Sequence, residues 1–195
     1  TGSTFANVTG QDVFSNTTAT AGQNVTVANS NSTGGALQFV FVDSASSANV
    51  GLNLTNNTVL GTGTKVRGLS VNAGATANVL ALVNANNITG CTGEGIRMSF
   101  FGAANARARL SANRTLGNLA GSGLSIFTAT ASTANFGGIF QNNTSDVFAL
   151  TRAAGTTFNV EELAQFNSVS NNTGTLITSG APAPTDVPAG SLGIP

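Results

Sequence analysis

Short runs of alternating apolar and polar residues recur along the whole chain, and Asn and Gly residues separate them. In a β-strand, successive side chains point to opposite faces, so this period-two pattern predicts strands with one buried face. The clearest runs are residues 25–27, 37–41, 50–54, 69–71, 79–82, 96–100 and 124–127. Helical spacing is nearly absent. Residues 160–166 (VEELAQF) are the one stretch that could wind.

A repeat becomes visible when the Asn residues are followed in order. An Asn closes an alternating run in each of six units, at intervals of 27 to 30 residues: Asn29, Asn56, Asn86, Asn113, Asn142 and Asn171. A second landmark, Ala followed by Asn, precedes four of these by seven or eight residues, at Asn49, Asn78, Asn105 and Asn135. Two landmarks in register predict a repeat protein with a period of about 28 residues.

A unit of this size cannot enclose a core alone, so successive units must stack to remove their apolar faces from water. Each unit holds two or three short strands separated by Asn and Gly turns. Strands of one unit then pair in parallel with those of the next. The sequence therefore predicts an all-β fold, a right-handed parallel β-helix (solenoid) of about six rungs.

The pattern resembles the right-handed parallel β-helix of the pectate-lyase-like superfold, and in particular its non-enzymatic repeat proteins. The resemblance lies in the motif x-Asn-Asn-x-(Ile/Val)-x-Gly followed by Gly-(Ile/Leu)-x-(Ile/Val/Phe), and it covers residues 24–177. It implies that aligned Asn residues stack at a bend as an asparagine ladder. Asn tolerates left-handed backbone, and its amide both donates and accepts, so identical rungs can satisfy one another. The six Asn residues that close the alternating runs are the predicted ladder.

The interior and the two ends follow from this arrangement. Eight Phe residues are expected to form internal stacks: Phe39, Phe41, Phe100, Phe127, Phe136, Phe140, Phe148 and Phe158. Residues 1–23 are predicted to be an N-terminal cap or an imperfect first rung, and residues 178–195 a Pro/Gly/Ala-rich tail or linker. Open strand edges template further pairing. We therefore expect the tail, a neighbouring domain or a second copy to cover the ends.

Composition narrows the classes of function. Of 195 residues, 41% are hydrophobic and only 7% are charged, and seven acidic residues balance seven basic ones. A chain without net charge has no long-range field for nucleic acid or anionic membranes, and no apolar run is long enough to insert in a bilayer. Abundant Asn, Thr, Ser and Gly with little Lys and Glu resembles exported bacterial surface proteins. We therefore expect an extracellular or cell-surface location.

The residues available for catalysis are few. His is absent and Cys91 is the single cysteine, which excludes His-based triads, histidine-containing zinc sites and internal disulfides. No catalytic residue, metal ligand or cofactor is predicted. Two alternatives remain. One is polysaccharide lyase or hydrolase chemistry on the scattered acids of the body, and the other is calcium held by one or two carboxylates and turn carbonyls.

Arginines form the most clustered charge. Arg107 and Arg109 alternate on one predicted strand and so point to the same face, Arg114 follows closely, and Arg97 lies one rung earlier. These four residues are a candidate patch for an anion or an acidic glycan. The alternative is a solvated face that discourages lateral aggregation.

The resulting expectation is an exported, non-enzymatic solenoid that serves as a structural or adhesive module of a cell surface, appendage or extracellular filament. Its partners would be further copies, neighbouring domains or surface glycans, and end-to-end self-assembly is the sharper version. The alternatives are a polysaccharide-cleaving β-helix enzyme and a glycan-binding module similar to a phage tailspike.

Overall fold

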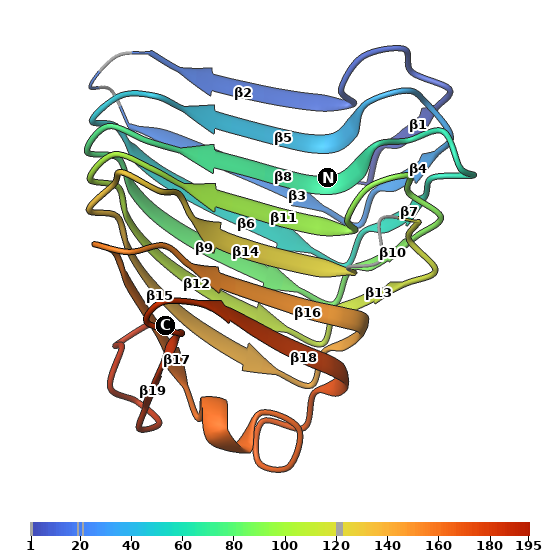
Figure 1. Cartoon of the computed structure of the whole chain (residues 1–195). Helices are drawn as coiled ribbons and strands as arrows, with labels where there is room; N and C mark the ends of the chain where they lie inside the picture. Colours follow the sequence, from blue (N-terminus) through green and yellow to red (C-terminus); the bar gives the residue numbers. More distant parts are fainter. Residues whose placement is uncertain (1, 19, 21, 120–122) are drawn as a thin grey trace.

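The protein is a parallel β-solenoid of about seven turns with a period of about 27 residues, which confirms the predicted all-β parallel β-helix (Figure 1). The structure is a computed structural model that describes residues 2–18, 20, 22–119 and 123–195. Every pairing between the described strands is parallel, and partners lie about one period apart in the sequence. The solenoid therefore has about one rung more than the sequence predicts.

Two sheets wrap around the core, and the first, sheet A, has 12 strands. Its short face holds β1 (Thr4–Ala6), β4 (Asn31–Thr33), β7 (Thr58–Leu60), β10 (Asn87–Thr89) and β13 (Arg114–Leu116). Its long face holds β2 (Val13–Thr17), β5 (Gln38–Ser44), β8 (Arg67–Ala73), β11 (Ile96–Phe100), β14 (Leu124–Thr128), β16 (Thr144–Arg152) and β18 (Thr173–Gly180). β16 joins the two faces because it pairs with both β13 and β14.

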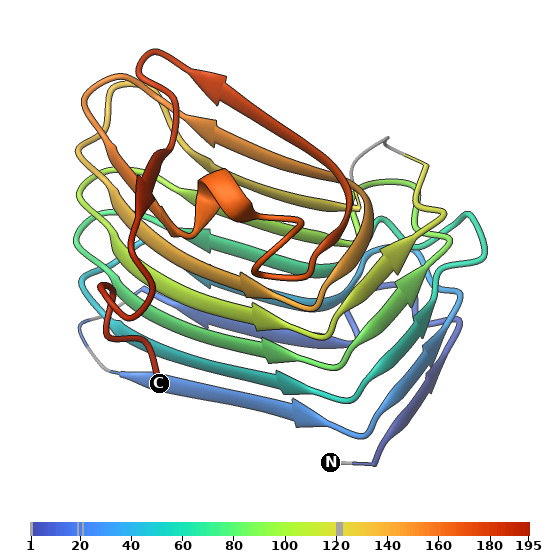
Figure 2. The same cartoon turned by 90° about the horizontal axis from the view of Figure 1, so that it is seen from below.

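Sheet B has seven strands and forms the remaining side. They are β3 (Gln23–Ala28), β6 (Asn49–Thr55), β9 (Asn78–Asn84), β12 (Asn105–Ser111), β15 (Asn135–Gln141), β17 (Thr157–Glu161) and β19 (Thr185–Val187). In Figure 2 successive rungs follow one another in sequence order from blue to red, with the strands of sheet B in front of the long face.

Parallel register places equivalent residues above one another in the core. On the long face, one inward column runs through Val40, Leu69, Ile96, Leu124 and Phe148, and each of these residues is fully buried. Burying a side chain of this size contributes about 1.5 to 3 kcal/mol. Stacking therefore supplies the hydrophobic burial that a single unit cannot achieve.

Six of the eight Phe residues expected inside are buried: Phe39, Phe100, Phe136, Phe140, Phe148 and Phe158. The expectation is wrong for Phe41 and Phe127, which lie on the outer side of the long face. Phe41 stacks on the exposed Phe14, with ring centroids 5.5 Å apart, and Phe127 lies under the guanidinium of Arg97. In the run LQFVFV both phases of alternation offer apolar residues, so periodicity alone does not choose the inward set.

The two ends belong to the solenoid. β1 and β2, from the segment predicted as a cap or imperfect rung, pair with β4 and β5, and so residues 1–23 contribute a first rung, apart from residues 1, 19 and 21, which lie outside the described chain. The predicted boundary at residue 178 falls inside β18. β19 then adds a seventh strand to sheet B, so the solenoid extends beyond the predicted limit of 177.

The C-terminal end of the interior is closed by a short turn of 3-10 helix, η1 (Leu163–Gln165), which crosses beneath the last rungs (Figures 1 and 2). Phe166, which follows η1, is buried and packs against the rings of Phe140 and Phe148 at centroid distances of 5.6 and 5.0 Å. The stretch 160–166 thus winds only from Leu163, because its first residues complete β17. Among the described residues, no helix has the length and apolar character needed to cross a membrane.

The last residues fold back over the outer side of sheet B. The Glu161 carboxylate accepts hydrogen bonds from the backbone N–H groups of Gly190 and Leu192, at 3.0 and 2.9 Å. The Leu192 side chain lies over Gly137, at a spot where a Cβ would be only 3.2 Å from it, and Ile194 is buried. The predicted tail therefore covers part of a sheet face and is not a detached linker.

The Phe166 ring closes the core, so its removal is expected to weaken this end of the solenoid. Phe166→Ala should lower the free energy of unfolding by about 3 to 5 kcal/mol, since it opens a cavity beside two other rings. Urea unfolding measures this, and hydrogen exchange should show the loss concentrated in β18. Phe14→Ala, at a ring that is 54% exposed, is the control. An equal loss in both variants would contradict the assigned role of Phe166.

Candidate functional site

A buried ladder of side-chain amides runs along the solenoid at the bend between sheet B and the short face. Its members are Asn57, Asn86, Asn113, Asn143 and Asn172, and all are almost completely buried. Each Nδ2 donates to the Oδ1 of the next member, at 2.8, 2.9, 3.0 and 3.0 Å along the series. The predicted asparagine ladder is therefore a real feature of the fold.

Each ladder oxygen also accepts a backbone hydrogen bond. The N–H of Asn86, for example, donates to the Oδ1 of Asn113 at 3.1 Å, and the N–H of Asn113 donates to the Oδ1 of Asn143 at 3.1 Å. The second Nδ2 proton donates to a backbone carbonyl; that of Asn113, for example, bonds to the carbonyl of Val83 at 2.8 Å. A buried polar group is costly unless it is hydrogen-bonded, and here every amide is bonded on both sides.

The ladder is terminated differently at its two ends. At the C-terminal end, the N–H and Nδ2 of Asn172 donate to the carbonyl oxygen of Phe166, at 3.3 and 3.0 Å. That carbonyl takes the place of the next ladder oxygen. At the N-terminal end, the series changes to Ser30, whose N–H donates to the Oδ1 of Asn57 at 3.0 Å and whose hydroxyl accepts from the N–H of Ser3 at 3.2 Å.

The register of the predicted ladder needs correction. Asn86 and Asn113 lie in it, whereas Asn29, Asn56, Asn142 and Asn171 each lie one residue before the buried position. These four have positive φ, between 52° and 56°, and form the bend itself. Asn is among the few residues that accept this conformation readily. In the other two rungs Ala85 and Ala112 occupy the bend, so the Asn that stands out in the sequence is already the ladder residue.

The bend Asn residues make a second, exposed set of bonds. The Nδ2 of Asn56 donates to the Oδ1 of Asn29 at 2.8 Å, and the Nδ2 of Asn171 donates to the Oδ1 of Asn142 at 2.9 Å. The Ala residues at the two middle bends interrupt this outer series. It therefore holds together two pairs of rungs and is not continuous.

The Ala-Asn landmarks begin the strands of sheet B. Their Ala residues (Ala48, Ala77, Ala104 and Ala134) are fully buried, and the following Asn residues form an exposed row across β6, β9, β12 and β15. Within the row, the Nδ2 of Asn78 donates to the Oδ1 of Asn49 at 3.2 Å. At the entry into sheet B, each of these rungs thus places a small Ala side chain inward and an amide side chain outward.

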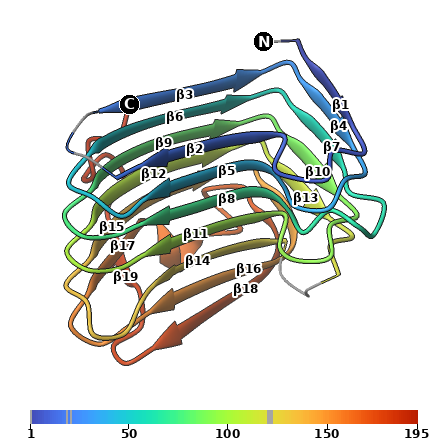
Figure 3. The same cartoon turned by 90° about the horizontal axis from the view of Figure 1, so that it is seen from above.

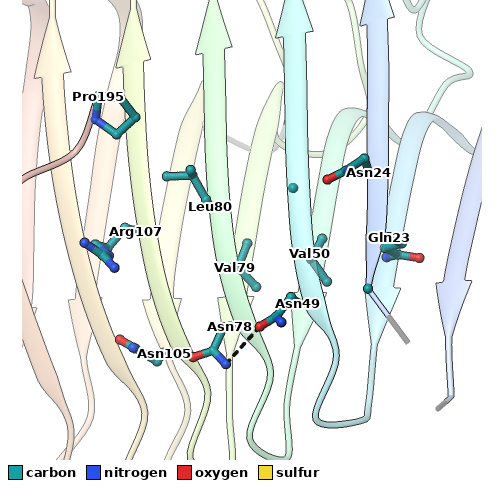
Figure 4. Close-up of a pocket in the computed structure, with 12 residues that line it drawn as sticks. Gln23, Asn24, Asn49, Val50, Asn78, Val79, Leu80, Asn105, Arg107 and Pro195 are labelled. Atoms are coloured by element: carbon teal, nitrogen blue, oxygen red, sulfur yellow. Dashed lines mark hydrogen bonds between the residues drawn. The ribbon is translucent and has the colours of Figure 1, made fainter. Parts of the chain in front are cut away.

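The row borders a groove on the outer side of sheet B (Figure 4). The groove has a volume of about 570 Å³ and crosses β3, β6, β9 and β12, with the tail residue Pro195 at one end. Its polar lining is almost entirely amide, from Gln23, Asn24, Asn49, Asn78 and Asn105, and Arg107 is its charged residue. Val50, Val79 and Leu80 supply the apolar part. Such a surface offers neutral donors and acceptors around one fixed positive charge.

The four arginines of the predicted patch do not come together. Arg107 and Arg109 share the outer side of β12, as predicted, although Arg109 is half-buried. Arg97 lies on β11, on the long face, and Arg114 lies on β13, on the short face, where its Nη1 donates to the Oδ1 of Asn87 at 3.2 Å. Closeness in sequence misled because the chain turns a corner between 109 and 114. Of the four, only Arg107 lines the groove.

Arg97 belongs instead to a cluster around Glu94. The Glu94 carboxylate accepts a hydrogen bond from Nε of Arg67 at 2.6 Å and lies 3.8 Å from Nη1 of Arg97. Partial burial would raise the pKa of Glu94, but its backbone hydrogen bond and the two guanidinium groups outweigh this and lower the pKa below its usual 4.5. The carboxylate thus stays ionised and joins the rung of β8 to that of β11.

A second charge pair is buried between rungs one and three. Nζ of Lys65 lies 3.1 Å from a carboxylate oxygen of Asp12, and the two side chains are 0% and 1% exposed. The Ser32 hydroxyl, from the rung between them, also donates to Asp12. Buried ion pairs need such extra hydrogen bonds to offset the loss of hydration. The pair fastens the loop before β2 to the body of the solenoid.

Cys91 lies close to this corner and is fully buried. Burial raises the pKa of its thiol to about 11, although the positive charge of Lys65 acts in the opposite direction. The neutral thiol is a poor nucleophile at physiological pH. Within the described residues, no group of three or more His, Cys, Asp or Glu side chains is placed to hold a metal ion.

Two functional contacts escaped sequence reasoning. Asp12 and Lys65 are 53 residues apart, close to two periods, and that spacing in a region with only one other charged residue, Asp43, is the signal that could have paired them. The carbonyl of Phe166 carried no signal, because a backbone oxygen has no side-chain identity.

Comparison with family models, with curated proteins and with solved structures finds no match to this chain.

The first prediction from this geometry concerns the ladder. Asn113→Leu removes both the acceptor used by Asn86 and the donor to Asn143, and leaves buried polar groups unpaired. We expect the free energy of unfolding to fall by roughly 1 to 3 kcal/mol, measured by urea unfolding. Asn105→Leu, in the exposed row of the same rung, is the matched control and should change stability little. Equal stability of the two variants would refute the ladder assignment.

The buried ion pair gives a second prediction. Lys65→Met leaves the Asp12 carboxylate buried without its cation and should cost about 3 to 5 kcal/mol of stability. The double variant Lys65→Met, Asp12→Asn removes both charges and keeps an acceptor for Ser32, so it should recover most of that loss. Thermal unfolding of wild type, single and double variants measures the cycle. A double variant as unstable as the single one would show that the charges are not coupled.

The Glu94 cluster gives a pH prediction. Because the folded state lowers the pKa of Glu94, its ionised form stabilises the fold above pH 4.5, and this contribution is lost as the pH falls toward the folded-state pKa. Glu94→Gln should therefore be less stable than wild type at neutral pH, and the difference should shrink in acid. Urea midpoints over a pH series measure it. A difference that is constant with pH would argue against the assignment.

Proposed function

We propose that the chain is an exported structural or adhesive module of a cell surface, appendage or extracellular filament, from the non-enzymatic branch of the pectate-lyase-like superfold. The observation that supports this most is that the buried polar and charged side chains bond one rung to the next. The amide ladder joins successive rungs, and the Lys65–Asp12 pair fastens the first rung to the third. A rigid rod whose polar groups are used in this way suits a structural unit.

The acidic residues support a structural role in preference to catalysis. Asp12 is buried against Lys65, Glu94 bonds to Arg67, and Glu161 anchors the tail. Opposed carboxylates that cleave a glycosidic bond face a shared substrate space. Here these three carboxylates hold rungs and tail together and point to different parts of the rod.

A second candidate function is glycan binding in the amide groove of sheet B. Amide side chains at one-rung intervals can exchange hydrogen bonds with sugar hydroxyls, and Arg107 would pair with a carboxylate or sulfate group. This reading is the adhesive form of the proposal, and it also accommodates a tailspike-like module. Surface glycans would then be the partner, with no cofactor.

One experiment separates these functions. The purified protein is incubated with a panel of neutral and acidic polysaccharides, and both cleavage products and retention on the immobilised polymers are measured. A structural module gives neither, and an adhesive module gives retention that Arg107→Ala weakens and Arg114→Ala leaves unchanged. Cleavage of any polymer, abolished by substitution of Arg97 or Arg107, would contradict the proposal and favour the enzyme.

A further inference from the structure

The amide groove of sheet B crosses β3, β6, β9 and β12, which lie side by side in this order along the rod (Figure 3). Two neighbouring columns of outward side chains border it (Figure 4). One column is the exposed row of Asn49, Asn78 and Asn105. The other column lies next to it on the same face and runs through Asn24, Gly51, Leu80 and Arg107. A chain molecule in this groove would therefore lie parallel to the axis of the rod.

The second column is interrupted at Gly51. This residue has no side chain, and the amide oxygen of Asn24 lies close to the position that a Cβ would take. A second hollow, with a volume of about 290 Å³, adjoins the groove here, since Asn24, Gly51 and Leu80 line both. Asn53 and Leu82 belong to the lining of the second hollow alone. The groove thus has a side branch at one defined rung.

The side branch has the polarity of an acetamido group. Its entrance offers the Oδ1 of Asn24, which bonds to no other described side chain. The Oδ1 of Asn53 accepts from the hydroxyl of Thr55 at 2.8 Å, and its Nδ2 donates to no described residue. Leu80, which is 37% exposed, and Leu82 supply apolar surface. An acetamido group has an N–H donor, a carbonyl acceptor and a methyl group, and each finds its complement here.

Arg107 supplies a positive charge two rungs from Gly51, which is about 10 Å along the axis. The ion pairs of the described residues involve Lys65, Arg67 and Arg97, so Arg107 is unpaired within this part of the chain. A guanidinium group binds a carboxylate through two parallel hydrogen bonds. The groove can therefore recognise an anionic group at a fixed distance from the side branch.

The amide row connects these two points. Its Asn residues recur at the rung spacing of about 4.8 Å, which is close to the length of one pyranose residue in an extended polysaccharide. Asn105 bonds to no other described side chain, and Asn78 uses only its Nδ2, which donates to Asn49. An amide both donates and accepts, as a sugar hydroxyl does. Successive sugar residues can thus bond to successive rungs.

We propose that the amide groove binds an acidic glycan that also carries acetamido groups, of the class in which uronic acid and N-acetylhexosamine residues alternate. An acetamido group enters the side branch at Gly51, and the carboxylate of a residue further along the glycan pairs with Arg107. The hydroxyls between them bond to the Asn row. The inference rests on the adhesive form of the proposed function and names the ligand class of that groove.

Three hexasaccharides separate the two recognition points. A hyaluronan hexasaccharide carries both groups, hexagalacturonate carries only carboxylates, and chitohexaose carries only acetamido groups. Binding to the full chain is measured by isothermal titration calorimetry at one low ionic strength, because salt screens charge contacts. The hyaluronan hexasaccharide should bind at least about tenfold more tightly than either of the others, since it alone uses both points.

Two variants should give a crossed pattern. Gly51→Val closes the side branch, and the strand tolerates it because the φ of Gly51 is not positive and the new Cβ meets only the flexible amide of Asn24. This variant should weaken hyaluronan and chitohexaose binding and leave hexagalacturonate binding unchanged. Arg107→Gln should weaken hyaluronan and hexagalacturonate binding, by at least about tenfold for hyaluronan, and leave chitohexaose binding unchanged.

Arg114→Gln is the matched control, because it removes the same charge on the short face, outside the groove. All three affinities should stay as in wild type. Circular dichroism and thermal unfolding of each variant verify the fold.

Three outcomes would overturn the inference. They are no binding of the hyaluronan hexasaccharide, hexagalacturonate binding as tight as hyaluronan binding, and hyaluronan binding that Gly51→Val does not weaken in a folded variant. None of these bears on polysaccharide cleavage. A chain that binds no glycan therefore keeps the structural role, whereas cleavage of a polymer removes that role even where the three hexasaccharides bind as expected.

Discussion

The fold depends on the hydrogen-bonding capacity of a carboxamide in a buried corner. A side-chain amide has donors and an acceptor, so a column of identical amides at one-rung spacing satisfies itself without water. In this protein each ladder oxygen after the first receives both a backbone N–H and the Nδ2 of the rung before it, and the first, that of Asn57, receives the N–H of Ser30. The bond from rung to rung thus ties the side-chain ladder to the backbone ladder, and a shift of one rung against the next would break both.

A ladder of this kind must end somewhere, and its direction makes the two ends unequal. Donors point toward the C-terminus, so the last amide needs an acceptor, and the carbonyl of Phe166 provides it while the Phe166 ring fills the end of the core. At the other end, a smaller residue, Ser30, needs no such replacement. The same segment therefore satisfies the last amide and excludes water from the last rung.

Much of the fold could be predicted because repetition averages out local ambiguity. Two Asn landmarks in register located the rungs and the ladder, but a doubled Asn does not reveal which residue bends the chain and which points inward. Only the φ of Asn56 and the burial of Asn57 decide it. The arginines were misplaced for a related reason, since a corner separates Arg109 from Arg114. The termination by Phe166 could not be predicted, because it depends on a backbone oxygen brought in by a non-repeating segment.

The most direct test of this account is side-chain amide hydrogen exchange in the native protein, followed by NMR. If the ladder holds the rungs together, the Nδ2 protons of Asn86 and Asn113 should exchange far more slowly than those of the exposed Asn49 and Asn78. These protons should lose their protection only when the whole rod unfolds. Rapid exchange of the Asn86 and Asn113 amides in the folded protein would contradict the claim that the ladder sets the register of the solenoid.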